Sequence, residues 1–367
     1  MLVAIFGVAY GIQLAKEPDE SGKVVLEGSP TTKKAKPTST TTTAEQKRED
    51  QVKIAWVGDI TPGSRYGVPP NDGAQQFAGV RKPLQSADVA IGNLEGTLGS
   101  GGSDKCGGAH SSTCFSFQAP ASQVKGLKRA GFDVFNLANN HALDFGAGGQ
   151  AQTVSTLDSA GIAHTGRPSE SAIVTRNGVR VAILGFAPYS WASPLLNIPA
   201  ASQQIREAAS KADVVVAVIH AGAEGADQVH VPAGDEQAFG EDRGDSRAFA
   251  RAAVAAGADL VVGSGPHVVR GLELVNGKVV AYSTGNFSGY NNFGSGGNLS
   301  LSGIVEVTLD KSGKTLSGRW YSVQLVGPGK PVLDSSHKSA SLVSSVSAAD
   351  FGSAAIRLTP SGAFRLP

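Results

Sequence analysis

The chain has 367 residues, of which 41% are hydrophobic and 17% are charged, and its formal net charge is +1 at pH 7. This length is sufficient for one large domain or two ordinary ones with a substantial hydrophobic core. The near-neutral charge gives no electrostatic reason to expect nucleic acid as a partner, because nucleic acids are bound through an excess of Lys and Arg.

Residues 1–15 predict a signal peptide or an N-terminal membrane anchor. Residues 2–15 are largely apolar, and roughly 14 apolar residues are too few for a bilayer crossing, which takes about 20. The length matches the apolar segment of a signal peptide, although no Lys or Arg precedes it. A start site assigned too far downstream would explain the missing basic residues, and a short buried helix is the alternative interpretation.

Residues 16–50 predict a disordered linker. They are rich in Thr, Lys and Pro and contain few large apolar side chains, so they cannot bury enough surface to offset the entropy lost on ordering. We expect the folded domain to cover residues 51–310 and residues 311–367 to form a β-rich C-terminal extension.

Between residues 51 and 310, short apolar runs alternate with helical segments. The runs are rich in β-branched residues and lack polar alternation, which is typical of strands covered on both faces. These expected strands are 52–58, 88–94, 133–138, 213–219 and 259–263, and the expected helices are 121–130, 148–160, 202–211 and 246–256. Two hairpins are expected at 172–186 and 272–283, because each has Asn-Gly between apolar runs. The acidic segment 236–245 predicts a solvated loop. The whole pattern predicts an α/β protein with mixed sheets.

The only two cysteines, Cys106 and Cys114, flank a short glycine-rich loop. A disulfide across this loop is expected to stabilise the fold by about 2–3 kcal/mol. A metal clip completed by His110 is the alternative, but two Cys and one His leave a zinc site short of ligands. Together with the N-terminal segment, the cysteines indicate an extracytoplasmic protein that is membrane-anchored or secreted.

Polar residues that can bind a metal follow five of the apolar runs. They are Asp59, Glu95, Asn140 with His141, His220 and His267. In α/β proteins such groups gather at the carboxyl ends of the strands, where separate segments meet in one pocket. Because oxygen and nitrogen donors of this kind suit hard or borderline divalent metals, the recurrence favours a shared metal site over five unrelated strand caps.

Five segments in a fixed order carry a resemblance to a known family. They are GDITPGSR (58–65), GNLEGTL (92–98), NLANNHALDFG (136–146), VIHAGAE (218–224) and the run 257–287, which contains GSGPHVVRG and YSTGNF. Together they resemble the poly-γ-glutamate capsule-biosynthesis proteins of the CapA type, which are similar to the calcineurin-like metallophosphoesterases. The resemblance covers about residues 51–310 and implies a four-layer α/β/β/α sandwich of two mixed sheets.

The resemblance also implies a metal centre of one or two divalent ions, with Mn, Mg, Fe or Zn as candidates. Glu95 would bridge two ions. Asp59 and His267 would bind the first ion, and Asn140 and His220 the second.

Further roles follow from the same resemblance. His141 would protonate a leaving group or stabilise developing charge, and Asp144 would orient its ring. Arg65, Glu224 and Asn286 would contact the substrate.

Two positions depart from the pattern of active phosphoesterases. Thr61 stands where a histidine is usual, and Ser264 and Gly265 occupy the place of a second histidine before His267. Each ion would then have three protein ligands, which Mg²⁺ and Mn²⁺ tolerate because they keep bound water, whereas tight binding of Zn²⁺ or Fe is less favoured. Binding of one ion, or of none, is the alternative. His230 could supply a further ligand or could be a solvated loop histidine.

Two functions fit these residues. The first is a metal-dependent hydrolase or transferase that acts on phosphoesters or polyglutamyl amides in capsule biosynthesis. The second is a non-catalytic component of capsule synthesis or export that binds an anionic cell-envelope polymer or its precursor. Membrane capsule-synthesis proteins are expected as partners and nucleic acid is not. Membership of such a family does not choose between the two, because capsule assembly is a process and not one reaction.

Overall fold

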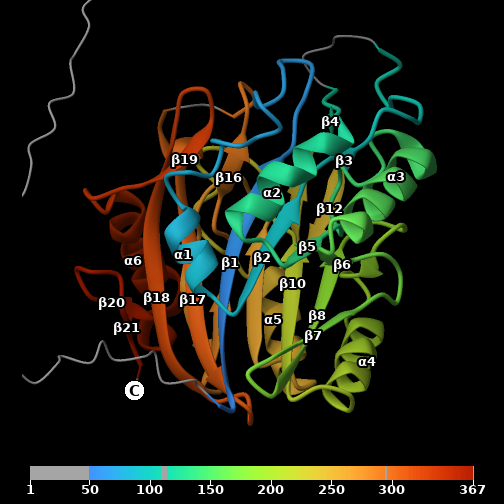
Figure 1. The fold of residues 1–367 in the computed structure, drawn as a ribbon. Coiled ribbons are helices and arrows are strands. Elements are labelled where there is room, and N and C mark those ends of the chain that lie inside the picture. Colours follow the sequence, from blue (N-terminus) through green and yellow to red (C-terminus); the bar gives the residue numbers. More distant parts are fainter. Residues whose placement is uncertain (1–48, 109–113, 294–295, 367) are drawn as a thin grey trace, which may run out of the picture. The chain divides into compact units, whose positions relative to one another are not determined.

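Two mixed sheets form the centre of the part of the chain that the computed structural model describes, which is residues 49–108, 114–293 and 296–366 (Figure 1). The expected N-terminal segment 1–15, residues 16–48 of the expected linker and His110 lie outside the described residues.

The first sheet has the strand order β19-β18-β17-β1-β2-β5-β6, and β16 also pairs with β1. Its strands are β1 (Gln51–Thr61), β2 (Val89–Leu94), β5 (Val134–Asn136), β6 (Ala163–Thr165), β16 (Asn286–Gly289), β17 (Leu301–Asp310), β18 (Thr315–Val326) and β19 (Lys330–Leu333). The pairs from β1 to β6 are parallel, whereas those from β1 to β19 are antiparallel. Strands β18 and β19 therefore extend this sheet with residues from beyond position 310.

The second sheet has the order β14-β15-β13-β10-β8-β7, and β9 also pairs with β8. Its strands are β7 (Ala172–Arg176), β8 (Val179–Ala187), β9 (Ser193–Pro194), β10 (Val214–His220), β13 (Leu260–Ser264), β14 (Leu272–Val275) and β15 (Lys278–Ala281). Its centre is parallel and its two edges are antiparallel hairpins. Both hairpins were expected from Asn-Gly, and both residues of each turn have positive φ, as a type I′ turn requires.

Six helices and three short strand pairs complete the described part. The helices are α1 (Arg81–Ser86), α2 (Val124–Ala130), α3 (Gly146–Ser159), α4 (Ile198–Ala209), α5 (Ser246–Ala255) and α6 (Lys338–Phe351). The 3-10 helices are Ala121–Gln123, Asn298–Ser300 and Gly352–Ala354. The short pairs are β3 (Thr97–Leu98) with β4 (Gln118–Ala119), β11 (Glu236–Ala238) with β12 (Glu241–Gly244), and β20 (Arg357–Leu358) with β21 (Phe364–Arg365).

Strand β1 shows how the layers arise from the sequence. Ile54 and Trp56 belong to the core between the two sheets, whereas Ala55 and Val57 belong to the core between the first sheet and its helices. Successive side chains point to opposite faces of a strand, so a run without polar alternation fits a strand covered on both sides. The Trp56 indole also donates to the carbonyl of Gly263, at 3.1 Å, and so joins the sheets directly.

Helices cover the outer face of each sheet. Leu84 of α1, Leu127 of α2 and Leu157 of α3 pack on the first sheet, and Ile205 of α4 and Phe249 of α5 pack on the second. Helix α6 contacts β14 of one sheet and β17 and β18 of the other. The result is the expected α/β/β/α sandwich. Among the described residues, no helix has both the length and the apolar character that a membrane crossing needs.

Candidate metal centre and the cleft beside it

Polar residues of both sheets lie in register at the carboxyl ends of the central strands. Asp59 of β1 is paired with Asn93 of β2 and Asn286 of β16. In the second sheet, His220 of β10 is paired with Ser264 of β13. Because parallel strands end at the same edge, residues far apart in sequence are brought to one place.

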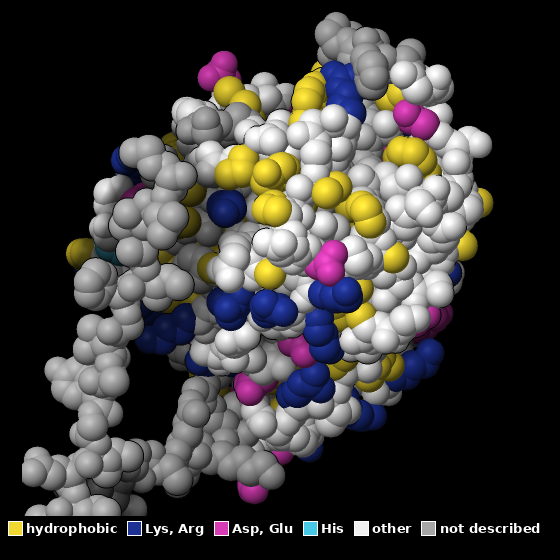
Figure 2. Space-filling model, turned by 45° about the horizontal axis from the view of Figure 1, so that its top comes forward, with side chains coloured by type: hydrophobic (Ala, Val, Ile, Leu, Met, Phe, Trp, Pro, Cys, Tyr) yellow, Lys and Arg dark blue, Asp and Glu magenta, His cyan; other side chains and the backbone are white. Residues whose placement is uncertain are grey.

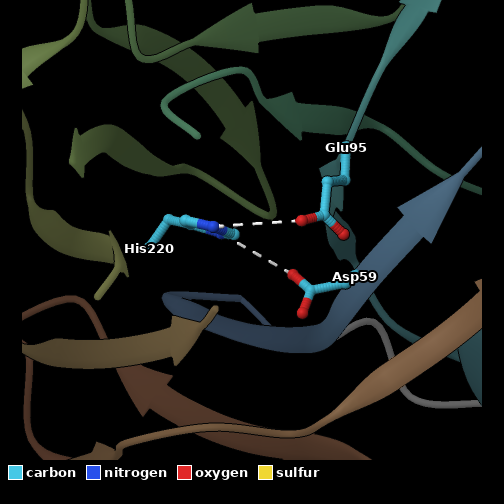
Figure 3. A group of neighbouring side chains, drawn as sticks. All are labelled: Asp59, Glu95 and His220. Atoms are coloured by element: carbon cyan, nitrogen blue, oxygen red, sulfur yellow. Dashed lines mark ion pairs between the residues drawn. The ribbon is translucent and has the colours of Figure 1, made fainter. Parts of the chain in front are cut away.

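Asp59, Glu95 and His220 form the centre of this site. Their ligand atoms all lie within 4.8 Å of one another, and all three side chains are fully buried. Figure 3 shows the His220 ring directed at the two carboxylates, with its Nδ1 at 3.7 Å from Asp59 Oδ1 and its Nε2 at 3.9 Å from Glu95 Oε1. These distances are too long for hydrogen bonds. The three side chains therefore face one another with no hydrogen bond between the ring and either carboxylate.

His267 is the fourth member of the group. Its Nδ1 lies 3.2 Å from Asp59 Oδ2 and 2.8 Å from Asn286 Oδ1. Its Nε2 lies 3.8 Å from Glu95 Oε1 and 3.5 Å from Glu224 Oε2. Its backbone has a φ of 63°, in the left-handed region that costs a non-glycine residue free energy. In this backbone conformation the His267 ring faces the carboxylates of Asp59 and Glu95.

Several buried polar atoms of the site lack a hydrogen-bond partner among the described residues. They are both carboxylate oxygens of Glu95, Nε2 of His220 and Oδ1 of Asn140. A buried polar atom without a partner costs about 1–3 kcal/mol, and native proteins rarely retain several together. Because oxygen and imidazole nitrogen are the donors that divalent cations accept, the residues fit a divalent metal.

Protonation in the site reflects the crowding of its carboxylates. Burial, together with the charge of Asp59, raises the pKa of Glu95 well above its usual range. Burial lowers the pKa of His220 to about 4, so this ring is neutral at pH 7 and its nitrogen is available to a cation. Burial alone would lower the pKa of His267, but the charge of Glu95 and the bond to Asp59 raise it well above its usual range. The raised pKa values of Glu95 and His267 both reflect the buried negative charge of the neighbouring carboxylates, which a bound cation would also compensate.

Asn93 holds the first carboxylate in place. Its amide donates to Asp59 Oδ1 at 2.8 Å, and its own oxygen accepts from Asn136 at 2.9 Å and from Asn139 at 3.1 Å. The sequence analysis gave Asn93 no role. No local sequence signal indicates it, because its position beside Asp59 depends on the register of β2 against β1.

His141 and Asp144 form a separate pair beside the cluster. His141 Nδ1 lies 2.7 Å from Asp144 Oδ2. Asp144 also accepts from the backbone N–H of Phe117 at 2.6 Å and lies 2.6 Å from Lys105 Nζ, a partner that the sequence did not indicate. Burial lowers the pKa of His141. With Nδ1 on Asp144, the neutral ring has Nε2 left for proton exchange.

A cleft of about 620 Å³ leads away from this pair. Asn140, His141 and Glu224 line it on the side of the candidate metal centre, and Lys105 and Arg243 add two cationic groups. Of the residues expected to contact substrate, Glu224 lines this cleft and Asn286 bonds to His267.

Arg65, the third residue expected to contact substrate, lies next to the disulfide loop. Its guanidinium is 2.6 Å from the Tyr66 hydroxyl and lies over the ring of Phe115. It lines a small pocket together with Cys106 and Cys114. These two cysteines form the expected disulfide.

The positions that depart from the phosphoesterase pattern are occupied by small polar groups. Thr61 is buried and 3.4 Å from the Asn292 amide. Ser264 Oγ lies 3.3 Å from His220 Nδ1, where it can fix the ring but leaves one nitrogen ligand fewer. His230 is exposed and bonds to Asp350 at 2.7 Å.

The prediction of a solvated loop at residues 236–245 is wrong. The segment forms the hairpin β11–β12, and its two ends carry the buried residues Glu236 and Arg243. Arg243 is 2% exposed and pairs with Glu224 at 2.7 Å. Its partner is 19 positions away, so the acidic composition of the segment gave no sign of the pairing.

The two mixed sheets and the helices on their outer faces define an α/β/β/α sandwich, with buried Asp, Glu and His side chains at the carboxyl ends of its central strands. The chain belongs to the bacterial capsule synthesis protein family PGA_cap, which it matches over residues 53–290. This confirms the resemblance drawn from the sequence motifs.

Individual relatives agree with the family. The chain is 32% identical to the PGA biosynthesis protein CapA of Bacillus subtilis over 264 residues, covering 65% of this chain and 63% of that protein. It is 29% identical to the capsule biosynthesis protein CapA of Bacillus anthracis over 270 residues, covering 66% and 61%. The chain thus spans less than two thirds of the length of these curated relatives. Among solved structures it is similar to a 5'-nucleotidase precursor from Thermus thermophilus, with a TM-score of 0.43, 15% identity and coverage of 77% of this chain and 54% of that one.

Proposed function

We propose that the protein is a metal-dependent hydrolase or transferase of capsule or polyglutamate biosynthesis. The observation that carries the proposal is the set of buried donor atoms on Glu95, His220 and Asn140 that have no partner among the described residues. Asp59 and His267 would complete the ligand set, since His267 lies 3.2 Å from Asp59 and 3.8 Å from Glu95. Mn, Mg, Fe and Zn are the candidate metals, and phosphoesters or polyglutamyl amides are the candidate substrates.

The chain's own residues supply the remaining chemistry of this proposal. A bound divalent cation provides Lewis acidity toward a phosphoryl or acyl oxygen. With the Nδ1–H of His141 donated to Asp144, the lone pair of Nε2 can take up a proton from a nucleophile and pass that same proton to a leaving group. Glu224, which is paired with Arg243, contacts His267 and fixes the ring that faces Asp59.

The proposal includes an extracytoplasmic location with membrane capsule-synthesis proteins as partners. It is supported by the disulfide between Cys106 and Cys114, because disulfides persist mainly in oxidising compartments. In this proposal residues 1–15 are the signal peptide or anchor and residues 16–50 are the linker.

The experiment that tests the proposal is elemental mass spectrometry of the purified full chain. We expect one or two equivalents of metal in the wild type and a loss of metal in Asp59→Ala and His220→Ala. Asp158→Ala and His230→Ala are matched controls, because both side chains are largely exposed, and they should retain the metal. A wild type that stays metal-free after incubation with Mn²⁺ or Mg²⁺ would refute the metal centre. If metal is present, a screen of phosphoesters and γ-glutamyl substrates with His141→Ala as the inactive variant tests catalysis.

A second candidate function, binding of an anionic polymer without catalysis, is favoured by a different observation. A groove of about 870 Å³ runs between α2 and α3, where Lys125, Lys128 and Arg129 line it and none of the described residues that line it is acidic. Figure 2 shows several Lys and Arg side chains, with Asp and Glu side chains among them, in the lower part of the face that it draws. Such a groove suits a polyanion, whose binding would weaken with salt.

The two candidates can be separated by measuring polyglutamate binding at low and high salt. In the binding candidate, Lys128→Glu with Arg129→Glu abolishes binding and His141→Ala leaves it intact. Lys211→Glu is the matched control, since Lys211 is exposed at the end of α4 and does not line the groove. Equal binding by the double variant and this control would refute the groove as a polymer site.

A further inference from the structure

Aromatic side chains line the cleft beyond the metal-binding residues. Tyr189 and Trp191 stack with ring centroids 4.9 Å apart and an angle of 8° between the rings. Phe115 and Phe239 line the same cleft. Four aromatic residues in one cleft form a concentration that composition alone does not suggest, because only 6% of the chain is aromatic.

The stacked pair is fixed relative to the candidate metal centre. The Trp191 indole donates to the carbonyl of Asn139 at 3.1 Å, and Asn139 directly precedes Asn140. The Tyr189 hydroxyl donates to Glu241 at 3.1 Å. A ligand group on these rings would therefore be held at a set distance from the metal-binding residues.

Phe239 contributes an unusual surface group. Its side chain is 83% exposed, more than any other large hydrophobic side chain in the described part of the protein. It lies at the tip of the hairpin β11–β12 and has a φ of 53°. Phe115 is 43% exposed. Single exposed apolar side chains are ordinary, but exposed aromatic groups that share a concave site with polar residues are typical of ligand binding.

The charges of the cleft argue against a linear polyanion as its main occupant. Lys105 already pairs with Asp144, and Arg243 pairs with both Glu224 and Glu241. Both cationic residues that line the cleft are thus compensated by carboxylates of the chain. The aromatic rings, in contrast, offer faces and edges to a flat or apolar ring.

We propose that this cleft binds a ring-bearing phosphorylated small molecule, with its ring on Tyr189, Trp191 and Phe239 and its anionic group at the candidate metal centre. The shared chemistry is a ring joined to a phosphate, and a nucleotide and a sugar phosphate are the two sources. The inference rests on the proposed metal-dependent function and narrows its substrate class.

Tryptophan fluorescence of the full chain provides the test. The three tryptophans are Trp56 and Trp320, which are 0% and 1% exposed, and Trp191, which lines the cleft. We would titrate uridine monophosphate, glucose 1-phosphate, uridine, inorganic phosphate and a glutamate trimer, each with and without Mn²⁺. Saturable quenching by either ring-bearing phosphate is expected, and Trp191→Phe should remove the signal.

Two surface variants test whether the rings cause the binding. Phe239→Ser should weaken binding of the ring-bearing phosphate about tenfold, which corresponds to the loss of one stacking contact. Leu316→Ser is the matched control, because Leu316 is also exposed, at 41%, but lies on β18 outside the cleft. Equal affinities in these two variants would overturn the proposal, as would Phe239-dependent binding of the glutamate trimer or equal affinities for phosphate and the ring-bearing phosphates.

The outcomes also separate this inference from the proposed metal centre. Uridine carries no phosphate, so its binding reports on the ring subsite whether or not the chain binds metal. Equal affinities for uridine and uridine monophosphate, unchanged between a chelator and Mn²⁺, would support the ring subsite and refute the metal centre. Metal binding without any response to either ring-bearing phosphate would support the centre and overturn the subsite.

Discussion

Two buried groups of charged residues in this protein differ in how completely their atoms are paired. Arg270 and Glu236 are 1% and 5% exposed and form a two-point ion pair, with both distances 2.8 Å. Two further N–H groups of Arg270 donate to the carbonyls of Gln228 and Ala223. Glu95, which is equally buried, has neither carboxylate oxygen in a hydrogen bond with a described residue.

The difference shows that burial and charge do not by themselves mark a functional site. Both groups contain buried acids, and both lie near the carboxyl end of β10. The group around Glu95 differs because both of its carboxylate oxygens lack a hydrogen-bond partner among the described residues. Ligand atoms of Glu95, Asp59 and His220 nevertheless lie within 4.8 Å of one another. The paired group holds the loop after β10 in place, and the unpaired group is available to a ligand.

The largest expected effect tests the paired group. Glu236→Gln keeps the shape of the side chain but leaves the buried charge of Arg270 uncompensated. We expect the free energy of unfolding to fall by about 3–5 kcal/mol, measured by urea denaturation. Glu207→Gln on the exposed surface of α4 is the matched control and should change it by less than about 0.5 kcal/mol. A small effect at Glu236 would mean that the pair is not a structural anchor.

Adding metal is expected to act on the unpaired group alone. At a Mn²⁺ concentration of about 100 times the Kd, binding stabilises the folded protein by about 2.7 kcal/mol. Thermal unfolding should therefore show a higher Tm with Mn²⁺ in the wild type and no shift in Glu95→Gln. Glu207→Gln again serves as the control and should show the same shift as the wild type. A shift that persists in Glu95→Gln would place the metal elsewhere.

In the presence of a chelator, the free energy of unfolding should depend on pH through Glu95 of the unpaired group. The pKa of Glu95 is raised well above its ordinary value of 4.5 by burial and by the charge of Asp59. Its folded state binds a proton more tightly than its unfolded state, so its stabilising contribution is complete below pH 4.5 and is lost as pH rises through the folded pKa. The loss has a slope of up to about 1.4 kcal/mol per pH unit. Urea denaturation at several pH values should show this slope in the wild type relative to Glu95→Gln, and parallel curves for the two proteins would contradict it.

The smallest expected effect concerns Lys105, whose ion pair is intermediate between the fully buried pair of Arg270 with Glu236 and the unpaired carboxylate of Glu95. It pairs with the buried Asp144 but its own side chain is 37% exposed. Lys105→Met should lower the free energy of unfolding by no more than about 1 kcal/mol. Lys125→Met, which breaks the exposed pair with Asp72, should have almost no effect. If both variants behave alike, the Asp144 carboxylate does not depend on Lys105.

The sequence predicted those parts of the fold and site that depend on local pattern. Strand ends that carry Asp59 or His220 are visible as apolar runs followed by one polar residue. The two hairpins follow from Asn-Gly, because these residues adopt the left-handed backbone that the turn needs. The pair of His141 and Asp144 is also local, since the two residues are three positions apart.

The parts that could not be predicted depend on contacts between distant segments. In the sequence, Arg243 is one basic residue within an acidic segment. Its burial depends on its ion pair with Glu224, which the sequence does not indicate. The position of Asn93 beside Asp59 depends on strand register, which one sequence does not specify. Trp191 likewise donates to the backbone carbonyl of Asn139. Every residue has such a carbonyl, so the amino-acid type at position 139 does not indicate this hydrogen bond.

The hairpin β11–β12 joins the two kinds of environment, and this has a consequence for protein engineering. Its ends are fastened by Glu236 and Arg243, whereas Phe239 and Gly240 at its tip extend away from the packed structure. The tip can therefore be replaced as a cassette while the anchored ends stay constant. Libraries confined to Phe239 and Gly240 would vary the aromatic surface of the cleft and leave the pairs of Glu241 with Tyr189 and Arg243 unchanged.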